Sequence, residues 1–400
     1  MFRMVDAFEY EYRDCDLIYG RGCVGRLGDY LAERGLDRAL VVCGSNVGAN
    51  DDLMNPVEGG LGERLTGVFD RTTSEKRAET AFEVVDALRE TDADVLVGVG
   101  GGSSLDVARQ ASVLAADDRS LAELRDEARD GEIGSFDSNG EKPPVIVVPT
   151  TFAGADVSSG GSVEILSAAE SPTAQPVSVG GSAMPISDFA DPSLFETTPV
   201  GALAGSAMNG FDKGIETPYA RDADPVSDAT AVHGLRLLSE ALPRVAGDEE
   251  PADAAATERA VVGLLLVQLD RKISVVHAFG HGFARRYAVQ QGAAHAVVVP
   301  HVLRYLFEGV DANRAALAEG FGIDPANHSD AELADAVVDA VAEVRDALDA
   351  PTRLRELPET RRADLLAIAE FIVDDHPMAR APAGLNPTAE EVEAVLREAW

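Results

Sequence analysis

Basic residues are scarce in this 400-residue chain. Its 34 lysines and arginines stand against 69 aspartates and glutamates, which gives a formal net charge of −35. This imbalance argues against nucleic acid as a partner, because phosphates require basic patches. The acidic residues are spread through helical segments such as 329–348. A spread acidic surface keeps a protein soluble in concentrated salt, so the composition is of haloarchaeal type; an unusually acidic mesophilic protein is the alternative.

Cysteines and long apolar runs are also few. Cys15, Cys23 and Cys43 form an odd set without CxxC spacing, which favours reduced thiols over a disulfide framework. No run of about 18 apolar residues occurs, so we expect no membrane span. The N-terminus lacks the charged-then-apolar pattern of a signal peptide. We therefore expect a cytoplasmic protein that binds neither membranes nor nucleic acid.

The chain is long enough for two domains. Its first half alternates short apolar runs with helical segments, which predicts a parallel sheet with helices on its faces; the strands are expected at 38–43, 93–97 and 144–149. Segment 159–189 is expected to form loops and a hairpin. From about residue 191 onward the periodicity is helical, with one helix expected over 254–277. This predicts an α/β domain, 1–190, and an all-helical domain, 191–400.

A glycine-rich turn joins the expected strand at 93–97 to a helix that begins near residue 105. It contains Gly100, Gly101, Gly102 and Ser103. Glycine lets the backbone approach a ligand closely, and the free N–H groups of a helix N-terminus favour an anion. The turn therefore predicts a pyrophosphate site, and a tight turn without a ligand is the alternative.

Two further loops follow expected strands. Thr150, Thr151 and Phe152 come directly after the strand at 144–149, and ligands of open α/β sheets bind at such strand ends. Hydroxyls there suit ribose or nicotinamide, although an ordinary loop is an equal alternative. Residues 44–46 (Gly44, Ser45 and Asn46) follow the strand at 38–43, where a carboxylate often holds the 2′-hydroxyl of NAD. The absence of a carboxylate at residues 44–46 modestly favours NADPH over NADH.

Together, these motifs resemble the iron-containing (group III) alcohol dehydrogenase family, whose members show GGGSxxDxAK, a PTT-type loop and then a metal-bearing helical domain. The resemblance covers nearly the whole chain, and the loop spacing at 150–156 and 295–301 is similar to the maleylacetate-reductase branch. It implies the dehydroquinate synthase-like fold, with a Rossmann-like α/β dinucleotide-binding domain over 1–190 and an all-α C-terminal substrate and catalytic domain over 191–400. It also places Asp106, the aspartate of the first motif, with the cofactor site. We further expect a homodimer.

The family's metal site is mostly replaced. Its four ligand positions, an Asp and three His, fall here at Asn209, Lys213, His277 and Gln291. Because an ammonium would repel a divalent ion, we expect no catalytic metal.

Lys213 is then the group expected to polarise the substrate carbonyl, with His277 and His281 as proton-relay groups. Asn209 and Lys213 are four residues apart, as are His277 and His281, so each pair shares one helix face. A solvated lysine and a structural His281 are the alternatives. His295 and His301 flank an apolar run, which favours structural roles for both.

The predicted function is that of an NAD(P)-dependent alcohol dehydrogenase or carbonyl reductase, with hydride transfer to a small carbonyl compound at the interdomain cleft. Two alternatives stay open. One is a non-redox lyase or synthase of the same superfamily, in which Lys213 does acid/base work. The other is a nucleotide-binding protein without catalysis.

The acidic surplus generates a first prediction. We expect the melting temperature to rise substantially between low and molar KCl, because screening relieves the self-repulsion of a chain with net charge −35. Thermal melts across a KCl series measure this. A neutral osmolyte at equal osmolality is the control, since it favours the compact state without screening charge. Equal midpoints in low and high salt would refute the halophilic interpretation.

Overall fold

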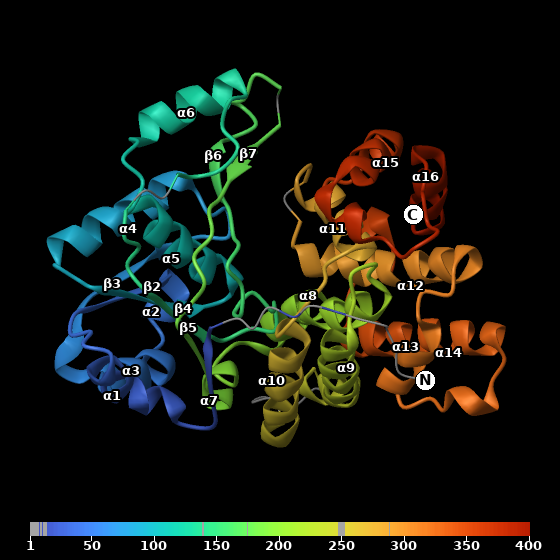
Figure 1. The fold of residues 1–400 in the computed structure, drawn as a ribbon, viewed down its shortest axis with the longest axis horizontal. Coiled ribbons are helices and arrows are strands. Elements are labelled where there is room, and N and C mark those ends of the chain that lie inside the picture. The colour runs from blue at the N-terminus through green and yellow to red at the C-terminus, as the bar shows by residue number, and fades with distance from the viewer. Residues whose placement is uncertain are drawn as a thin grey trace. The chain divides into compact units, whose positions relative to one another are not determined.

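The computed structural model describes residues 8, 10, 14–137, 140–173, 175–246, 253–287 and 289–400. They form two compact units, an α/β unit and a helical unit (Figure 1). Of the described residues, the α/β unit contains 14–151 together with Ala155–Thr198. The helical unit contains Phe152–Gly154 and Pro199–Trp400. The chain therefore passes into the helical unit a few residues after the boundary expected near 188–192, and also briefly at Phe152.

The α/β unit is built on a six-stranded sheet in the order β1-β8-β5-β4-β2-β3, with every neighbouring pair parallel. Its strands are β1 Asp16–Tyr19, β2 Ala39–Gly44, β3 Leu65–Thr72, β4 Val95–Gly100, β5 Val145–Pro149 and β8 Ser187–Ala190. The parallel α/β prediction is confirmed, and the three expected strands are β2, β4 and β5.

The segment expected to hold loops and a hairpin contains both a hairpin and a strand. β6 (Val163–Leu166) and β7 (Val177–Val179) pair antiparallel, as predicted. The end of the segment was wrongly assigned, because Ser187–Ala190 forms β8 inside the sheet. The polar residues Ser187 and Asp188 interrupt the apolar run that marks a buried strand, although all four residues of β8 are buried.

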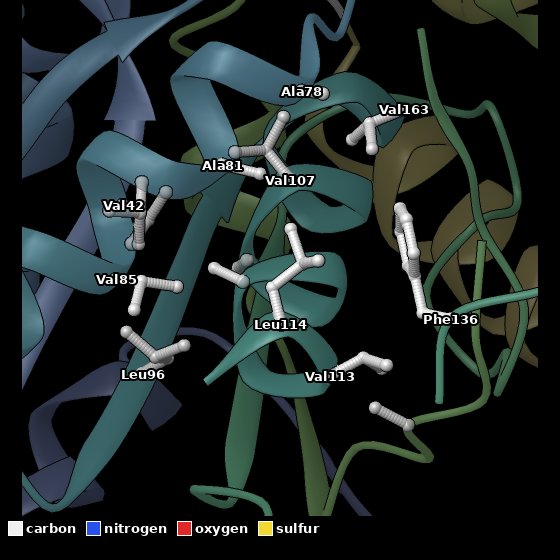
Figure 2. Packing of buried hydrophobic residues seen from close by; sticks show 14 of the residues in the cluster. Val42, Ala78, Ala81, Val85, Leu96, Val107, Val113, Leu114, Phe136 and Val163 are labelled. Atoms are coloured by element: carbon white, nitrogen blue, oxygen red, sulfur yellow. The ribbon is translucent and has the colours of Figure 1, made fainter. Parts of the chain in front are cut away.

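Helices cover both faces of this sheet, as a parallel sheet requires. Alternate residues of a strand point to opposite faces, so Val42 and Val41 of β2 belong to different cores. Figure 2 shows Val42 and Leu96 of the sheet near Val85 of α4 and Leu114 of α5. The helices of this unit are α1 Leu27–Glu33, α2 Ser45–Gly48, α3 Asp51–Leu61, α4 Ala78–Glu90, α5 Gly102–Leu114, α6 Leu121–Asp130 and α7 Pro192–Phe195.

The helical unit consists of α-helices joined by turns and short 3-10 helices. Its α-helices are α8 Val200–Tyr219, α9 Pro225–Val245, α10 Ala254–Gln268, α11 Val275–Ala284, α12 Gln291–Gly309, α13 Arg314–Gly320, α14 Asp330–Ala347, α15 Leu365–Asp374 and α16 Ala389–Glu398. This confirms the all-helical prediction for the second half of the chain. None of the helices in the described ranges is long and apolar enough to cross a membrane.

The prediction of a single helix over 254–277 was wrong. The structure ends α10 at Gln268 and begins α11 at Val275. Between them, the backbone N–H of Lys272 donates to Thr217 Oγ1 of α8 at 3.0 Å, and Lys272 Nζ pairs with Asp270 at 2.9 Å. These contacts replace the helical hydrogen bonds of this segment, so the helix stops and restarts. As a result, His277 and His281 lie together on the short helix α11.

Candidate functional site

The carboxyl ends of three adjacent strands bring the expected cofactor residues to one edge of the α/β unit. Strands β2, β4 and β5 are neighbours in the sheet, and they end at Gly44, Gly100 and Pro149. The backbone N–H of Thr150 donates to the carbonyl of Gly100 at 3.1 Å. A Cβ on Gly101 would lie 3.3 Å from Thr151 Cγ2. The structure thus places the glycine-rich turn against the threonine loop.

The glycine-rich turn ends at the N-terminus of α5. Gly100 has φ of +126°, a conformation that side chains with a Cβ rarely adopt. Gly101 occupies the N-cap, and no side chain caps the first turn of the helix. Uncapped N–H groups and the helix dipole together favour an anion at this position. The site therefore fits the pyrophosphate of a dinucleotide.

Asp106 lies further along α5 in a network of charges. Its carboxylate accepts hydrogen bonds from Lys76 Nζ at 2.9 Å and from Arg109, whose side chain is fully buried. Burial opposes ionisation of Asp106, but the charges of Lys76 and Arg109 outweigh it and hold its pKa below the ordinary value. The structure therefore gives Asp106 two protein partners, and its expected contact with the cofactor stays a prediction.

The turn after β2 is more acidic than its own sequence indicates. Ser45 and Asn46 are exposed and begin α2. Asp70, on the adjacent strand β3, packs against this short helix: a Cβ on Gly48 would lie 2.8 Å from Asp70 Cβ. The sequence offered no sign of this carboxylate, because Asp70 is distant along the chain and becomes a neighbour only through β2–β3 pairing. It would weaken the modest preference for a 2′-phosphate.

In the helical unit, Lys213 is not a solvated surface lysine. It lies on α8 and is only 5% exposed. Its Nζ donates to the carbonyl oxygens of Ala153 at 3.1 Å and Asn209 at 2.7 Å, and to Asn209 Oδ1 at 3.3 Å. Gly154 and Gly210 allow this arrangement, because a Cβ on Gly210 would lie 2.3 Å from the carbonyl of Phe152.

Phe152 belongs to this lysine's surroundings. It falls in the helical unit, its side chain is 1% exposed, and its N–H donates to Ser206 Oγ at 3.0 Å. The expectation grouped Phe152 with Thr150 and Thr151 at the cofactor, whereas those two threonines belong to the α/β unit. The hydrogen bond from the Phe152 N–H to Ser206 holds this loop on α8, which positions the carbonyl of Ala153 for Lys213.

Three histidines of the helical unit each lie against a carboxylate. On α11, His277 Nδ1 makes a short contact with Glu216, which also accepts from the His277 N–H at 3.0 Å. His281 Nδ1 lies 2.6 Å from Asp375 Oδ2. On α12, His295 Nδ1 lies 2.7 Å from Asp212 Oδ2, without the alignment of a hydrogen bond. The ring of His277 also contacts those of His295, at 4.6 Å between centroids, and His281, at 6.4 Å.

Burial sets the protonation states of the carboxyl and imidazole groups around His277 and His295. It raises the pKa of Glu216 to about 8 and that of Asp212 well above the usual range. It lowers the pKa of His295 to about 3, and burial with the nearby His295 and Lys213 charges lowers that of His277 well below its ordinary value. The carboxylates and imidazoles at the centre therefore favour neutral forms. The Lys213 ammonium, in contrast, is stabilised by hydrogen bonds to three oxygen acceptors.

The four positions that correspond to the family's metal ligands do not fit a divalent ion. Lys213 Nζ is hydrogen-bonded to Asn209 Oδ1, so a cation occupies the side of the site where two ligands would be needed. Among the described residues, the one group of three His, Cys, Asp or Glu donors within metal-binding distance is His281, Asp375 and His376. It includes none of Asn209, Lys213, His277 and Gln291.

Several residues of this site were missed by the sequence analysis. Asp212 and Glu216 are four residues apart on α8, and that spacing could have marked a shared face. His295 was interpreted as structural because it flanks an apolar run, and only the structure places it against Asp212. Asp375 and His376 gave no sequence signal, since they lie 94 and 95 positions from His281 and meet it only through packing of α11 on α15 and the 3-10 helix η6 (His376–Arg380).

Comparison with known proteins gives matches along both units. Residues 15–170 match the model described as iron-containing alcohol dehydrogenase, and residues 203–400 match the C-terminal model of the Fe-containing alcohol dehydrogenase family. The chain is 25% identical over 367 residues to NAD-dependent methanol dehydrogenase of Bacillus methanolicus, covering 90% of this chain and 91% of that protein. It is 28% identical over 317 residues to maleylacetate reductase of Rhizobium sp. (strain MTP-10005), covering 78% and 80%.

A solved structure shows the same fold. The crystal structure of a 1,3-propanediol oxidoreductase superposes with a TM-score of 0.85 at 21% identity, covering 98% of this chain and 100% of that one. At this identity the likeness concerns the fold alone. It extends over both units.

The packing of His295 yields a second prediction. A Cβ on Gly280 would lie 2.1 Å from His295 Nε2, so Gly280→Ala should force the imidazole out of place and lower stability by about 1–3 kcal/mol, as overpacking does. Denaturant unfolding in molar salt measures the loss. Gly201→Ala is the matched control: Gly201 is also helical, nothing lies within 4 Å of its added Cβ, and the helix should gain slightly. Equal stability of the two variants would contradict the tight contact.

Proposed function

The chain belongs to the iron-containing alcohol dehydrogenase family, and from this premise we propose that it is a nicotinamide-dependent oxidoreductase acting on CH–OH groups without a catalytic divalent metal. The family match and the named activities of the relatives support the reaction class. The observation that carries the metal-free part is the buried Lys213 ammonium bonded to Asn209 Oδ1 and to two carbonyl oxygens. The substrate is a small carbonyl compound or alcohol.

Lys213 is proposed as the group that polarises the substrate. In the reducing direction, the hydride for the carbonyl carbon would come from a nicotinamide held by the α/β unit. Negative charge then develops on the carbonyl oxygen, and an ammonium aimed at that oxygen stabilises it. Lys213 can reorient one donor toward substrate while keeping its backbone acceptors, because an ammonium has three. Fixed charge in a water-poor site is worth more than in bulk solvent.

The histidines are proposed to handle the proton. Reduction of a carbonyl to an alcohol consumes one proton in addition to the hydride. His277 and Glu216 are both driven toward their neutral forms and share a short contact, so one proton lies between them. His281 is the next ring toward the surface, with 19% of its side chain exposed. We therefore assign His277 to the proton transfer and His281 to its replenishment.

The α/β unit is proposed to hold the cofactor. Gly100, Gly101, Gly102 and Ser103 at the α5 N-terminus suit its pyrophosphate, and Thr150 and Thr151 suit the nicotinamide half. The turn at Gly44, Ser45 and Asn46 suits the adenosine ribose, with a modest preference for NADPH. Asp106, which pairs with Lys76 and Arg109, is kept in this proposal as a cofactor-binding residue.

A third prediction tests Lys213. Lys213→Ala should reduce turnover by about 10²–10³, the usual loss for one polarising donor, and should leave cofactor affinity unchanged. A panel of carbonyls with NADH and NADPH, followed by absorbance of the reduced nicotinamide, supplies the substrate and the rate. Lys142→Ala is the matched control, since that partly exposed lysine donates to the carbonyl of Ser182 in the α/β unit. Turnover of the wild-type protein should persist after dialysis against a chelator.

Two results would contradict this assignment. One is an unchanged rate in Lys213→Ala, and the other is activity that appears only when iron or zinc is added. Catalysis without net change in the nicotinamide band would instead favour the lyase or synthase alternative, in which the cofactor is used only transiently. Binding of nucleotide without conversion of any carbonyl would favour a non-catalytic protein.

A fourth prediction concerns cofactor choice. Ser45→Asp should weaken NADPH binding roughly five- to tenfold relative to NADH, because a carboxylate repels the 2′-phosphate. Ser45 is the better position than Gly44, where a Cβ would lie 3.2 Å from the carbonyl of Thr72. Asp70→Asn should act in the opposite sense, since it removes the carboxylate that packs on α2. Fluorescence titration measures both, with Ser45→Asn as the uncharged control; a wild-type preference for NADH would overturn the proposed NADPH preference.

A further inference from the structure

A cluster of metal-ligating side chains lies outside the four positions that correspond to the family's metal ligands. It consists of His281 on α11, Asp375 directly after α15, and His376 at the start of η6. One donor atom from each lies within 4.8 Å of the others, and no other such group occurs in the described part of the chain. Asp375 Oδ2 lies 2.6 Å from His281 Nδ1, and Oδ1 lies 3.5 Å from His376 Nδ1. The two imidazole rings are 5.8 Å apart and 31° from parallel.

We propose that His281, Asp375 and His376 bind a divalent transition metal of the zinc class. Two imidazole nitrogens and one carboxylate are a ligand set that zinc accepts, with water in the remaining position. Magnesium and calcium require mainly oxygen ligands, which this cluster does not offer. The site differs from the one expected for the family, because it shares no residue with Asn209, Lys213, His277 and Gln291.

The fold holds the carboxylate ready and leaves a path for the ion. The side chain of Asp375 is 3% exposed, and its two oxygens face the two different histidines. Packing of α11 against α15 and η6 fixes His281 beside Asp375. His376 is 64% exposed, so the cluster opens to solvent on its side. An ion can therefore reach three donors with only small adjustments of the two rings.

The positive charge of Arg285 would limit the affinity of this site for a metal ion. Arg285 Nη2 lies 3.7 Å from Asp375 Oδ1 and would repel a cation there. Its side chain is about half exposed and extends over the Phe371 ring, so it can turn toward solvent when an ion binds. We therefore expect binding that is weaker than at a four-ligand structural zinc site. Removing Arg285 should strengthen it.

The site bears on the proposed reaction through His281. A metal bound to His281 would withdraw that imidazole from proton exchange with His277, whose ring is 6.4 Å away. Added zinc should then inhibit turnover. This consequence rests on the proposed function, whereas metal binding itself does not.

Metal binding is tested directly on the full chain. Protein freed of metal with a chelator, and then dialysed, is titrated with Zn²⁺ by calorimetry and with Co²⁺ by visible absorption. We expect one ion per chain, and Co²⁺ bands characteristic of imidazole and carboxylate ligands. His376→Gln and Asp375→Asn should each weaken binding by about 10–100-fold or more, because losing a ligand costs at least as much as losing its support. His328→Gln, at an exposed histidine of the same unit, should bind as the wild type does.

The outcomes separate the two proposals. Equal affinity of wild type, His376→Gln and Asp375→Asn would overturn the metal site, and so would the absence of Co²⁺ bands. Zinc inhibition is then measured for each variant relative to its own metal-free rate. Inhibition of wild type and His328→Gln, with resistance in His376→Gln, supports the link to His281; inhibition that persists in His376→Gln overturns that link. A protein that binds one ion but turns over no carbonyl would retain the site and remove the proposed function.

Discussion

The arrangement of the helical unit depends on one buried cation. Withdrawing an ammonium from water costs several kcal/mol, and Lys213 is stable inside only because three oxygens surround it. Hydrogen bonds from a charged donor contribute about 1.5–3 kcal/mol each, enough together to offset that cost. Two of the acceptors come from Asn209, one turn earlier on α8. The third requires the loop at Ala153 to lie directly on the helix, which the absence of a side chain at Gly210 permits.

The same burial explains the protonation of the neighbouring groups. Asp212 and Glu216 could have formed ion pairs with Lys213, but Asp212 points to His295 and Glu216 to His277. Away from water, both carboxyls favour their neutral forms, and so do both imidazoles. The ammonium therefore lacks a compensating negative charge next to it. A lysine in this state attracts an electron-rich oxygen, which is the property that a carbonyl reductase needs at this position.

The sequence was sufficient where a feature is local, and insufficient where it arises from packing. The turns at Gly100–Ser103 and at Thr150–Thr151 each follow a strand, and parallel strands deliver their carboxyl ends to one edge, so this candidate surface could be predicted. The pairing of Asn209 with Lys213 followed from helical spacing. Asp375 could not be assigned to His281, because only the packing of α15 on α11 joins them. Asp70 lies beside the turn at Gly44–Asn46 only because β3 pairs with β2. Between α10 and α11, the Lys272 N–H donates to Thr217 of another helix, a contact that the sequence could not indicate.

The chain carries a net charge of −35, whereas its candidate site holds the positive charge of Lys213. Burial separates this cation from the acidic surface. A net charge of −35 places a negative potential around the molecule, which would favour a metal cation in any exposed cluster of ligands. At Lys213 a cation built into the chain occupies the corresponding position, so we expect the external field to recruit no ion there. At His281, Asp375 and His376 no such built-in cation blocks the donors, and Arg285 opposes an ion only from an exposed position. We therefore infer that the buried ammonium of Lys213 is what excludes a divalent ion from one of these two places and not from the other.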